Sequence, residues 1–229
     1  MELDYVTARR YWRALVDNAT RLIADAHLLL DAESFGRARS LTVLAEEELG
    51  KALSVYEVYS AGWSAGVSGS LDLTDTGSRD HLAKYMAAFE FGRELERFWG
   101  GGYEGLHPED DDWEGWIVKR RTESQEAARV ANRQKQRGFY VDLEAGEVRT
   151  PDELDAGTVA DALTRAAQVI EMMLITDHTR MQDGPTERFD STTVQQWSVM
   201  QTAHPEEFAE FLGHVRETAK ADGLLDDDD

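Results

Sequence analysis

The chain of 229 residues contains no cysteine, which excludes disulfide bonds, thiolate zinc sites and cysteine nucleophiles. It has only four prolines, and no apolar run approaches the ~20 residues that a membrane-spanning helix needs. The first residues, 1–4, lack the basic and apolar regions of a signal peptide. We therefore expect a soluble, cytoplasmic protein that makes no use of a membrane.

Lysine is also scarce, because only five of the 24 basic side chains are lysine, against 45 acidic side chains and a net charge of −21. Two interpretations fit this composition. One is a high-salt cytoplasm, in which ions screen the self-repulsion of an acidic surface. The other is a GC-rich genome combined with the acidic tail 226–229. In both cases the average field repels nucleic acid and anionic membranes, so RNA would have to bind at a local basic patch.

Apolar residues recur at helical spacing along most of the chain. The pattern predicts helices over about 5–30, 35–59, 78–99, 116–136, 155–181, 192–202 and 205–221. A glycine-rich, acidic loop is expected over 100–115, and the alternating segment 139–149 predicts a small β-hairpin. We interpret residues 1–225 as a single all-α domain, a helical bundle that carries the hairpin, followed by the acidic tail 226–229.

Several polar side chains fall on helix faces that are otherwise apolar. If the first three helices pack together, these side chains form one buried network: Asn18, Asp25, Glu48, Lys51, His81 and Lys84. The network has two interpretations, either a satisfied polar core that fixes helix register or a catalytic site. In the second, His81 acts as acid and base and is oriented by Glu48 or Asp25.

The second helix contains the most informative part of this pattern, residues 44–52. Glu48 lies on the apolar stripe, so we expect it to point inward. Glu47 either forms an exposed ion pair with Lys51, four residues on, or joins the buried network. Gly50 weakens a helix by about 1 kcal/mol relative to alanine, which indicates that another helix packs closely there.

One segment departs from the acidic character of the chain, because 119–137 has seven basic and two acidic residues. Its basic side chains include a strip near the end of the fourth helix: Arg129, Arg133, Lys135 and Arg137. The strip either pairs with the acidic segment 109–112 or binds RNA or a protein partner. No metal-ligand motif and no nucleotide-binding motif occurs, so we expect no metal and no cofactor.

Four segments occur together in an order that resembles the AbiV family. They are Asn18-Ala19 with Asp25-Ala26, the run Glu47–Lys51, His81 with Lys84, and the run Gln136–Asp142. AbiV proteins are bacterial and archaeal abortive-infection proteins, usually grouped with the all-α HEPN superfamily. The resemblance covers residues 18–142 and implies phage defence, a helical bundle and a homodimer.

Many HEPN proteins are metal-independent ribonucleases in which four to six residues separate an arginine from a following histidine. Only Arg21 and His27 have that spacing here, and the polar residue that usually follows the arginine is missing. Three hypotheses remain. The protein blocks phage by binding a viral or host component, or it is a ribonuclease toxin that uses His81 with Glu48, Lys51 and Lys84. The third is an acidic helical scaffold unrelated to defence.

Overall fold

Helices dominate the computed structural model, which describes residues 2–72, 81–98, 112–183 and 193–221. Within these residues, seven α-helices and two two-stranded sheets occur in the order β1 (Glu2–Asp4), α1 (Tyr5–Asp31), α2 (Phe35–Ala65), β2 (Ser70–Asp72), α3 (His81–Phe98), α4 (Trp113–Arg137), β3 (Asp142–Glu144), β4 (Glu147–Arg149), α5 (Ala156–Asp183), α6 (Thr193–Ala203) and α7 (Pro205–Ala221). The all-α fold class with its small hairpin is confirmed. The expected acidic loop 100–115 ends earlier than predicted, because 113–115 belong to α4; residues 100–111 and the tail 226–229 lie outside the described residues.

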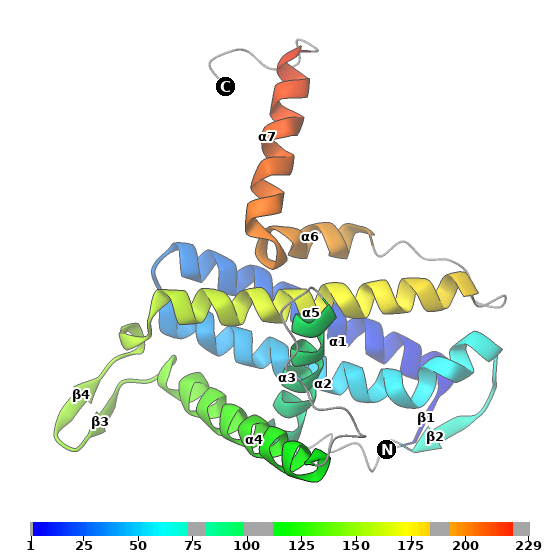
Figure 1. Ribbon diagram of the computed structural model, residues 1–229, viewed down its shortest axis with the longest axis horizontal. Coiled ribbons are helices and arrows are strands. Elements are labelled where there is room, and N and C mark those ends of the chain that lie inside the picture. Colours follow the sequence, from blue (N-terminus) through cyan, green and yellow to red (C-terminus); the bar gives the residue numbers. More distant parts are fainter. Residues whose placement is uncertain (1, 73–80, 99–111, 184–192, 222–229) are drawn as a thin grey trace.

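Helix α2 is the centre of the bundle, because α1, α3, α4 and α5 all contact it. Figure 1 shows α1, α2 and α5 running side by side, with α4 on one side of them and α6 on the other. Helix α7 leaves the end of α6 and projects away from this body. The four contacts of α2 mean that each of its faces meets a different neighbour.

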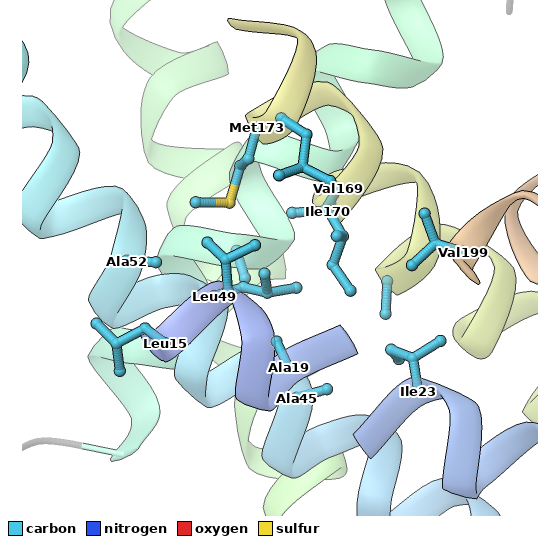
Figure 2. Close-up of a cluster of buried hydrophobic side chains, with 14 of the residues drawn as sticks. Leu15, Ala19, Ile23, Ala45, Leu49, Ala52, Val169, Ile170, Met173 and Val199 are labelled. Atoms are coloured by element: carbon cyan, nitrogen blue, oxygen red, sulfur yellow. The ribbon is translucent and has the colours of Figure 1, made fainter. Parts of the chain in front are cut away.

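The main hydrophobic core lies between α1, α2, α5 and α6 (Figure 2). Helix α1 contributes residues three or four positions apart, as a helix face requires, such as Ala19, Ile23 and Ala26. Leu49 of α2 and Ile170 of α5 meet this face, and neither is exposed to solvent. Burial of such aliphatic side chains stabilises the bundle by roughly 1.5–3 kcal/mol each.

The described residues also form two short sheets of two strands each. Strands β1 and β2 pair antiparallel, with Leu3 opposite Leu71, and the hydroxyl of Tyr59 lies 2.9 Å and 2.6 Å from the carbonyl oxygens of these two residues. The predicted hairpin forms as β3 and β4, joined by Ala145 and Gly146, both with positive φ. Positive φ at both central residues is typical of the tight turn that suits a twisted hairpin.

Gly50 is a point of close approach between α2 and α3. A Cβ added at Gly50 would lie 1.9 Å from the backbone oxygen of Lys84. This confirms the interpretation of Gly50 as a packing position. The close approach also brings the start of α3 over the run of glutamates 46–48 on α2, where the candidate site lies.

Candidate functional site

Three consecutive glutamates of α2, Glu46, Glu47 and Glu48, form the centre of the candidate site. Successive residues of a helix are rotated by about 100°, so the three side chains leave α2 in different directions. Glu46 and Glu47 are buried, whereas the Glu48 side chain is one-fifth exposed. Glu46 and Glu47, and not Glu48, are therefore the glutamates that point inward, and the expectation for Glu48 was wrong.

Glu47 links α2 to both α3 and α4. Its Oε2 lies 2.8 Å from Nδ1 of His81, the first residue of α3, and its Oε1 accepts a hydrogen bond from Nζ of Lys135 on α4. Glu47 and Lys135 are only 5% and 8% exposed, while the His81 side chain is 65% exposed. A buried carboxylate of this kind is stable only because both of its oxygens have partners.

Glu46 forms a second buried pair on the neighbouring face of α2. Its carboxylate accepts a hydrogen bond from Arg39 at 3.1 Å, and Nε of Arg39 donates to the side-chain oxygen of Gln134 at 2.8 Å. Burial raises the pKa of Glu46, although Arg39 opposes this shift. Burial, together with the negative charge of Glu46, also raises the pKa of Tyr85 to about 12. The sequence interpretation did not include Glu46, Arg39 or Tyr85.

The remaining members of the predicted catalytic set lie in two places. Glu48 pairs with Lys51, three residues along α2, and both side chains are partly exposed. The expected alternative of a Glu47–Lys51 pair is wrong, since Glu47 faces His81 and Lys135 instead. Lys84 is 8% exposed, and its backbone lies against Gly50. The structure thus brings His81 to Glu47 rather than to Glu48.

Asn18 and Asp25 of α1 do not belong to this network, because both are exposed. The buried face of α1 is centred on Trp12, Ala19 and Ile23, with spacings of seven and four. Asn18 and Asp25 were expected to be buried because they fall near the line of Leu15 and Leu22, which are seven residues apart. Residues spaced every seven positions drift by about 20° per heptad around a straight helix, so the polar residues beside this line turn toward solvent.

A single family match spans the helices that form the candidate site. A sequence model of AbiV, from the HEPN group, matches residues 7–171. The chain belongs to the AbiV family. Membership implies abortive-infection phage defence. The AbiV match runs from the start of α1 into α5, so it includes the glutamates of α2, His81, α4 and the hairpin. No curated protein and no solved structure matches the chain.

The Arg21 and His27 pair of this AbiV protein does not converge on a common point. The ring of His27 contacts α6, with Nδ1 3.1 Å from the hydroxyl of Thr202 and Nε2 3.3 Å from the amide of Gln201. Arg21 is exposed on α1. Residues six apart on a helix differ by about 240° in direction, so the two side chains leave α1 on different faces.

The predicted basic strip divides between the surface and the interior. Arg129 and Arg133 are exposed and lie 3.5 Å and 3.2 Å from the carboxylate of Glu126. Arg137 is also exposed and lies 2.6 Å from Glu144 of the hairpin. Lys135 is the exception, because it turns inward to Glu47 and so cannot belong to a surface strip. The expected acidic partners 109–111 lie outside the described residues.

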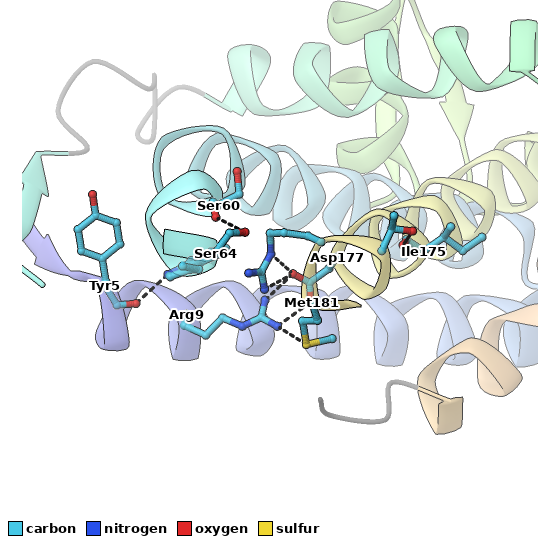
Figure 3. A network of polar contacts seen from close by, with 10 residues as sticks. Tyr5, Arg9, Ser60, Ser64, Ile175, Asp177 and Met181 are labelled. Carbon is cyan, nitrogen blue, oxygen red and sulfur yellow. Dashed lines mark hydrogen bonds and ion pairs between the residues drawn. The ribbon is translucent and has the colours of Figure 1, made fainter. Parts of the chain in front are cut away.

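A second polar cluster joins α1 to α5, and sequence reasoning missed it (Figure 3). Asp177 is fully buried and accepts hydrogen bonds from Arg9 at 2.6 Å and 2.9 Å and from Arg180 at 2.9 Å and 3.0 Å. The guanidinium of Arg9 also lies 4.8 Å from the ring of Trp12 and 5.1 Å from that of Trp63. The available signal was the position of Asp177 on the apolar stripe of α5, seven residues after Ile170.

Neither polar cluster resembles a metal centre. Within the described ranges, no group of three or more His, Asp or Glu side chains could hold a metal ion. Across the same ranges, no helix is long and apolar enough to cross a membrane.

Proposed function

We propose that this AbiV-family protein acts in phage defence by binding a viral or host component, and that it does so in the cytoplasm as a homodimer. The proposal is supported by how its buried charges are used. Both oxygens of Glu47 are occupied by His81 and Lys135, and Glu48 is occupied by Lys51. Buried carboxylates whose oxygens already have partners within the protein fix the register of its helices.

The hairpin supplies the surface for this binding. Tyr140, Val141, Leu143 and Val148 are each between 62% and 73% exposed. Exposed apolar side chains gathered on one small element mark a contact surface more often than a solvated one. Their position on a hairpin outside the bundle allows a protein partner to reach them without any change of the core.

A phage-sensitivity assay tests this proposal. Cells that produce the protein should resist phage, and the double variant Val141→Ser, Leu143→Ser should lose that resistance at equal protein level. The matched control is Val6→Ser, Leu28→Ser, which removes two apolar side chains of equal exposure (71% and 66%) from α1. Resistance that survives the hairpin variant would contradict the proposal. Full sensitivity with the unaltered chain would favour the scaffold hypothesis.

One observation favours the alternative, a HEPN-type endoribonuclease. The buried Glu47 fixes Nδ1 of His81 and leaves most of the ring exposed, an arrangement that can orient an imidazole general base. In this alternative Lys51 and Lys84 would attract the phosphate, and Glu47, in place of the expected Glu48, would orient His81. Incubation with total RNA in high salt tests it, since cleavage that disappears in a folded His81→Ala variant would establish catalysis. No cleavage under any condition would exclude it.

A further inference from the structure

Helix α7 has a surface that its own bundle does not cover. Phe208, Phe211, Leu212 and Val215 follow the spacing of a single helix face, and the last three are 42–49% exposed. Every residue of 205–218 except Phe208 is exposed. Figure 1 shows why, because α7 stands away from the body of the protein. It also lies beyond the segment that matches the AbiV family.

A groove that could receive such a helix lies between α3 and α4. One hollow of about 560 Å³ is lined by Leu82, Met86, Arg121, Gln125 and Arg129, among others. An adjoining hollow of about 270 Å³ shares Met86, Glu90 and Arg121 and adds Trp116 and Ile117. The groove is therefore lined by apolar side chains, by arginines and by Glu90, and Arg121 is exposed with no ion-pair partner within the described residues.

The charges of α7 and of the groove are complementary. The charged residues that line the groove are Arg120, Arg121 and Arg129 against Glu90, a net charge of +2 in a chain of −21. Helix α7 has four glutamates against Arg216 and Lys220. Opposite patches of this kind favour one docking arrangement over others. An apolar helix face flanked by glutamates suits an apolar groove flanked by arginines.

The lengths of the two surfaces also agree. The apolar face of α7 from Phe208 to Val215 rises about 10 Å, and the part of α3 that lines the groove, from Leu82 to Glu90, rises about 12 Å. The groove cannot be filled by the α7 of the same chain, because α4 and α7 lie on opposite sides of the central helices in Figure 1. A second copy of the chain can supply the helix.

We propose that α7 of one copy docks into the α3–α4 groove of a second copy. The inference rests on the homodimer proposed above and names its contact. The apolar face of α7 covers Leu82, Met86 and Ile117, and its glutamates meet Arg121 and Arg129. Reciprocal exchange of the two helices closes the assembly as a dimer, which head-to-tail docking of only one helix would not do.

The absence of cysteine makes a direct test possible. Two single-cysteine chains of different mass, Leu212→Cys on α7 and Gln125→Cys in the groove, are mixed and oxidised mildly. The expected product is the mixed disulfide. Replacing Gln125→Cys by Leu143→Cys, which is 73% exposed on the hairpin, gives the control that should not cross-link above background. A dominant disulfide between two Leu212→Cys chains would show that α7 pairs with α7, and would overturn the proposal.

Sedimentation velocity on the full chain separates this contact from dimerisation itself. Arg121→Glu, Arg129→Glu should raise the dissociation constant of the dimer at least tenfold. Adding Glu207→Arg, Glu210→Arg to the same chain should restore the dimer. The control Arg133→Glu, Arg137→Glu changes two other exposed arginines of α4 and should leave the dimer intact.

The remaining outcomes each overturn one of the two statements. A stable dimer that neither cross-links nor responds to the groove variant would place the contact elsewhere and leave the homodimer standing. A monomer at every concentration would remove both. If the groove variant loses binding of total RNA but not the dimer, the groove takes RNA, and the assignment of α7 to it is wrong.

Discussion

Replacing Glu47 by alanine should destabilise the fold far more than the same replacement at Glu48. Glu47→Ala leaves the ammonium of Lys135, which is 8% exposed, without the carboxylate that neutralises it. Breaking a buried ion pair in this way costs about 3–5 kcal/mol. We take about 3 kcal/mol, because the second partner of Glu47, His81, is largely solvated and loses little.

The neighbouring replacement has a much smaller expected effect. Glu48 and Lys51 are one-fifth to one-quarter exposed and lie three residues apart on the same helix. Pairs of this kind contribute about 0.2–0.5 kcal/mol. For a chain of this length each kcal/mol shifts the melting temperature by about 2–4 °C. The expected shifts are therefore about 6–12 °C for Glu47→Ala and about 1–2 °C or less for Glu48→Ala.

Thermal denaturation followed by circular dichroism measures the two shifts of melting temperature, and urea denaturation measures the two free energies of unfolding. The uncharged variant Glu47→Gln, Lys135→Met is the internal check, since replacing a buried pair as a whole is far less costly than removing one partner. It should be more stable than Glu47→Ala. If Glu48→Ala destabilises the protein as much as Glu47→Ala does, or more, the assignment of the inward glutamate is wrong.

Three further predictions concern other parts of the fold. In urea denaturation, Gly50→Ala should destabilise the protein by about 1–3 kcal/mol, because its Cβ would lie 1.9 Å from a backbone oxygen of α3. Gly213→Ala, with open space around it, should stabilise the protein by up to about 1 kcal/mol. Asp177→Ala should lower the free energy of unfolding by about 3–5 kcal/mol and the melting temperature with it, because it removes a buried ion pair. Glu126→Ala, which removes an exposed pair, should cost about 1 kcal/mol or less. Equal shifts of the melting temperature would contradict this prediction. The pKa of Asp155 lies below 3.8 in the fold because the backbone N–H and the hydroxyl of Thr158 donate to it, so its contribution is present above pH 3.8 and is lost as the pH falls through the lower folded value. Asp155→Asn, which caps a helix without titrating, should give a flatter dependence of stability on pH below that point, and an unchanged profile would refute the assignment.

The elements of the fold could be predicted from the sequence because they depend on local spacing. The helix expected over 5–30 is α1, Tyr5–Asp31, and the helix expected over 205–221 has the bounds of α7. The helix expected over 35–59 ends later, at Ala65, because Tyr59 and Trp63 are buried and extend its packed face. Strands β1 and β2 could not be predicted, since three residues of each pair only through contacts across 66 or more positions.

The candidate site was predicted only in part, for a physical reason. Periodicity locates a helix face to within about one residue step, and one step is about 100° of rotation. That uncertainty is enough to exchange Glu47 with Glu48 and to turn Asn18 inward when it faces solvent. The distant partners Lys135 and Arg39 depend on which helices become neighbours, and a single sequence does not contain that information.

The run Glu46–Glu48 shows how one helix can hold three carboxylates in three environments. Because α2 is in contact with four other helices, the rotation of about 100° from one residue to the next brings each side chain to a different neighbour. Glu46 meets Arg39 of its own helix beside α4, Glu47 meets His81 and Lys135, and Glu48 stays at the surface. Each buried carboxylate then selects one helix arrangement, since any slip in register would leave a charge without its partner. A centre stabilised in this way tolerates little movement, so recognition by this protein is best sought on α7, the hairpin and the α3–α4 groove, which can bind partners while the core stays unchanged.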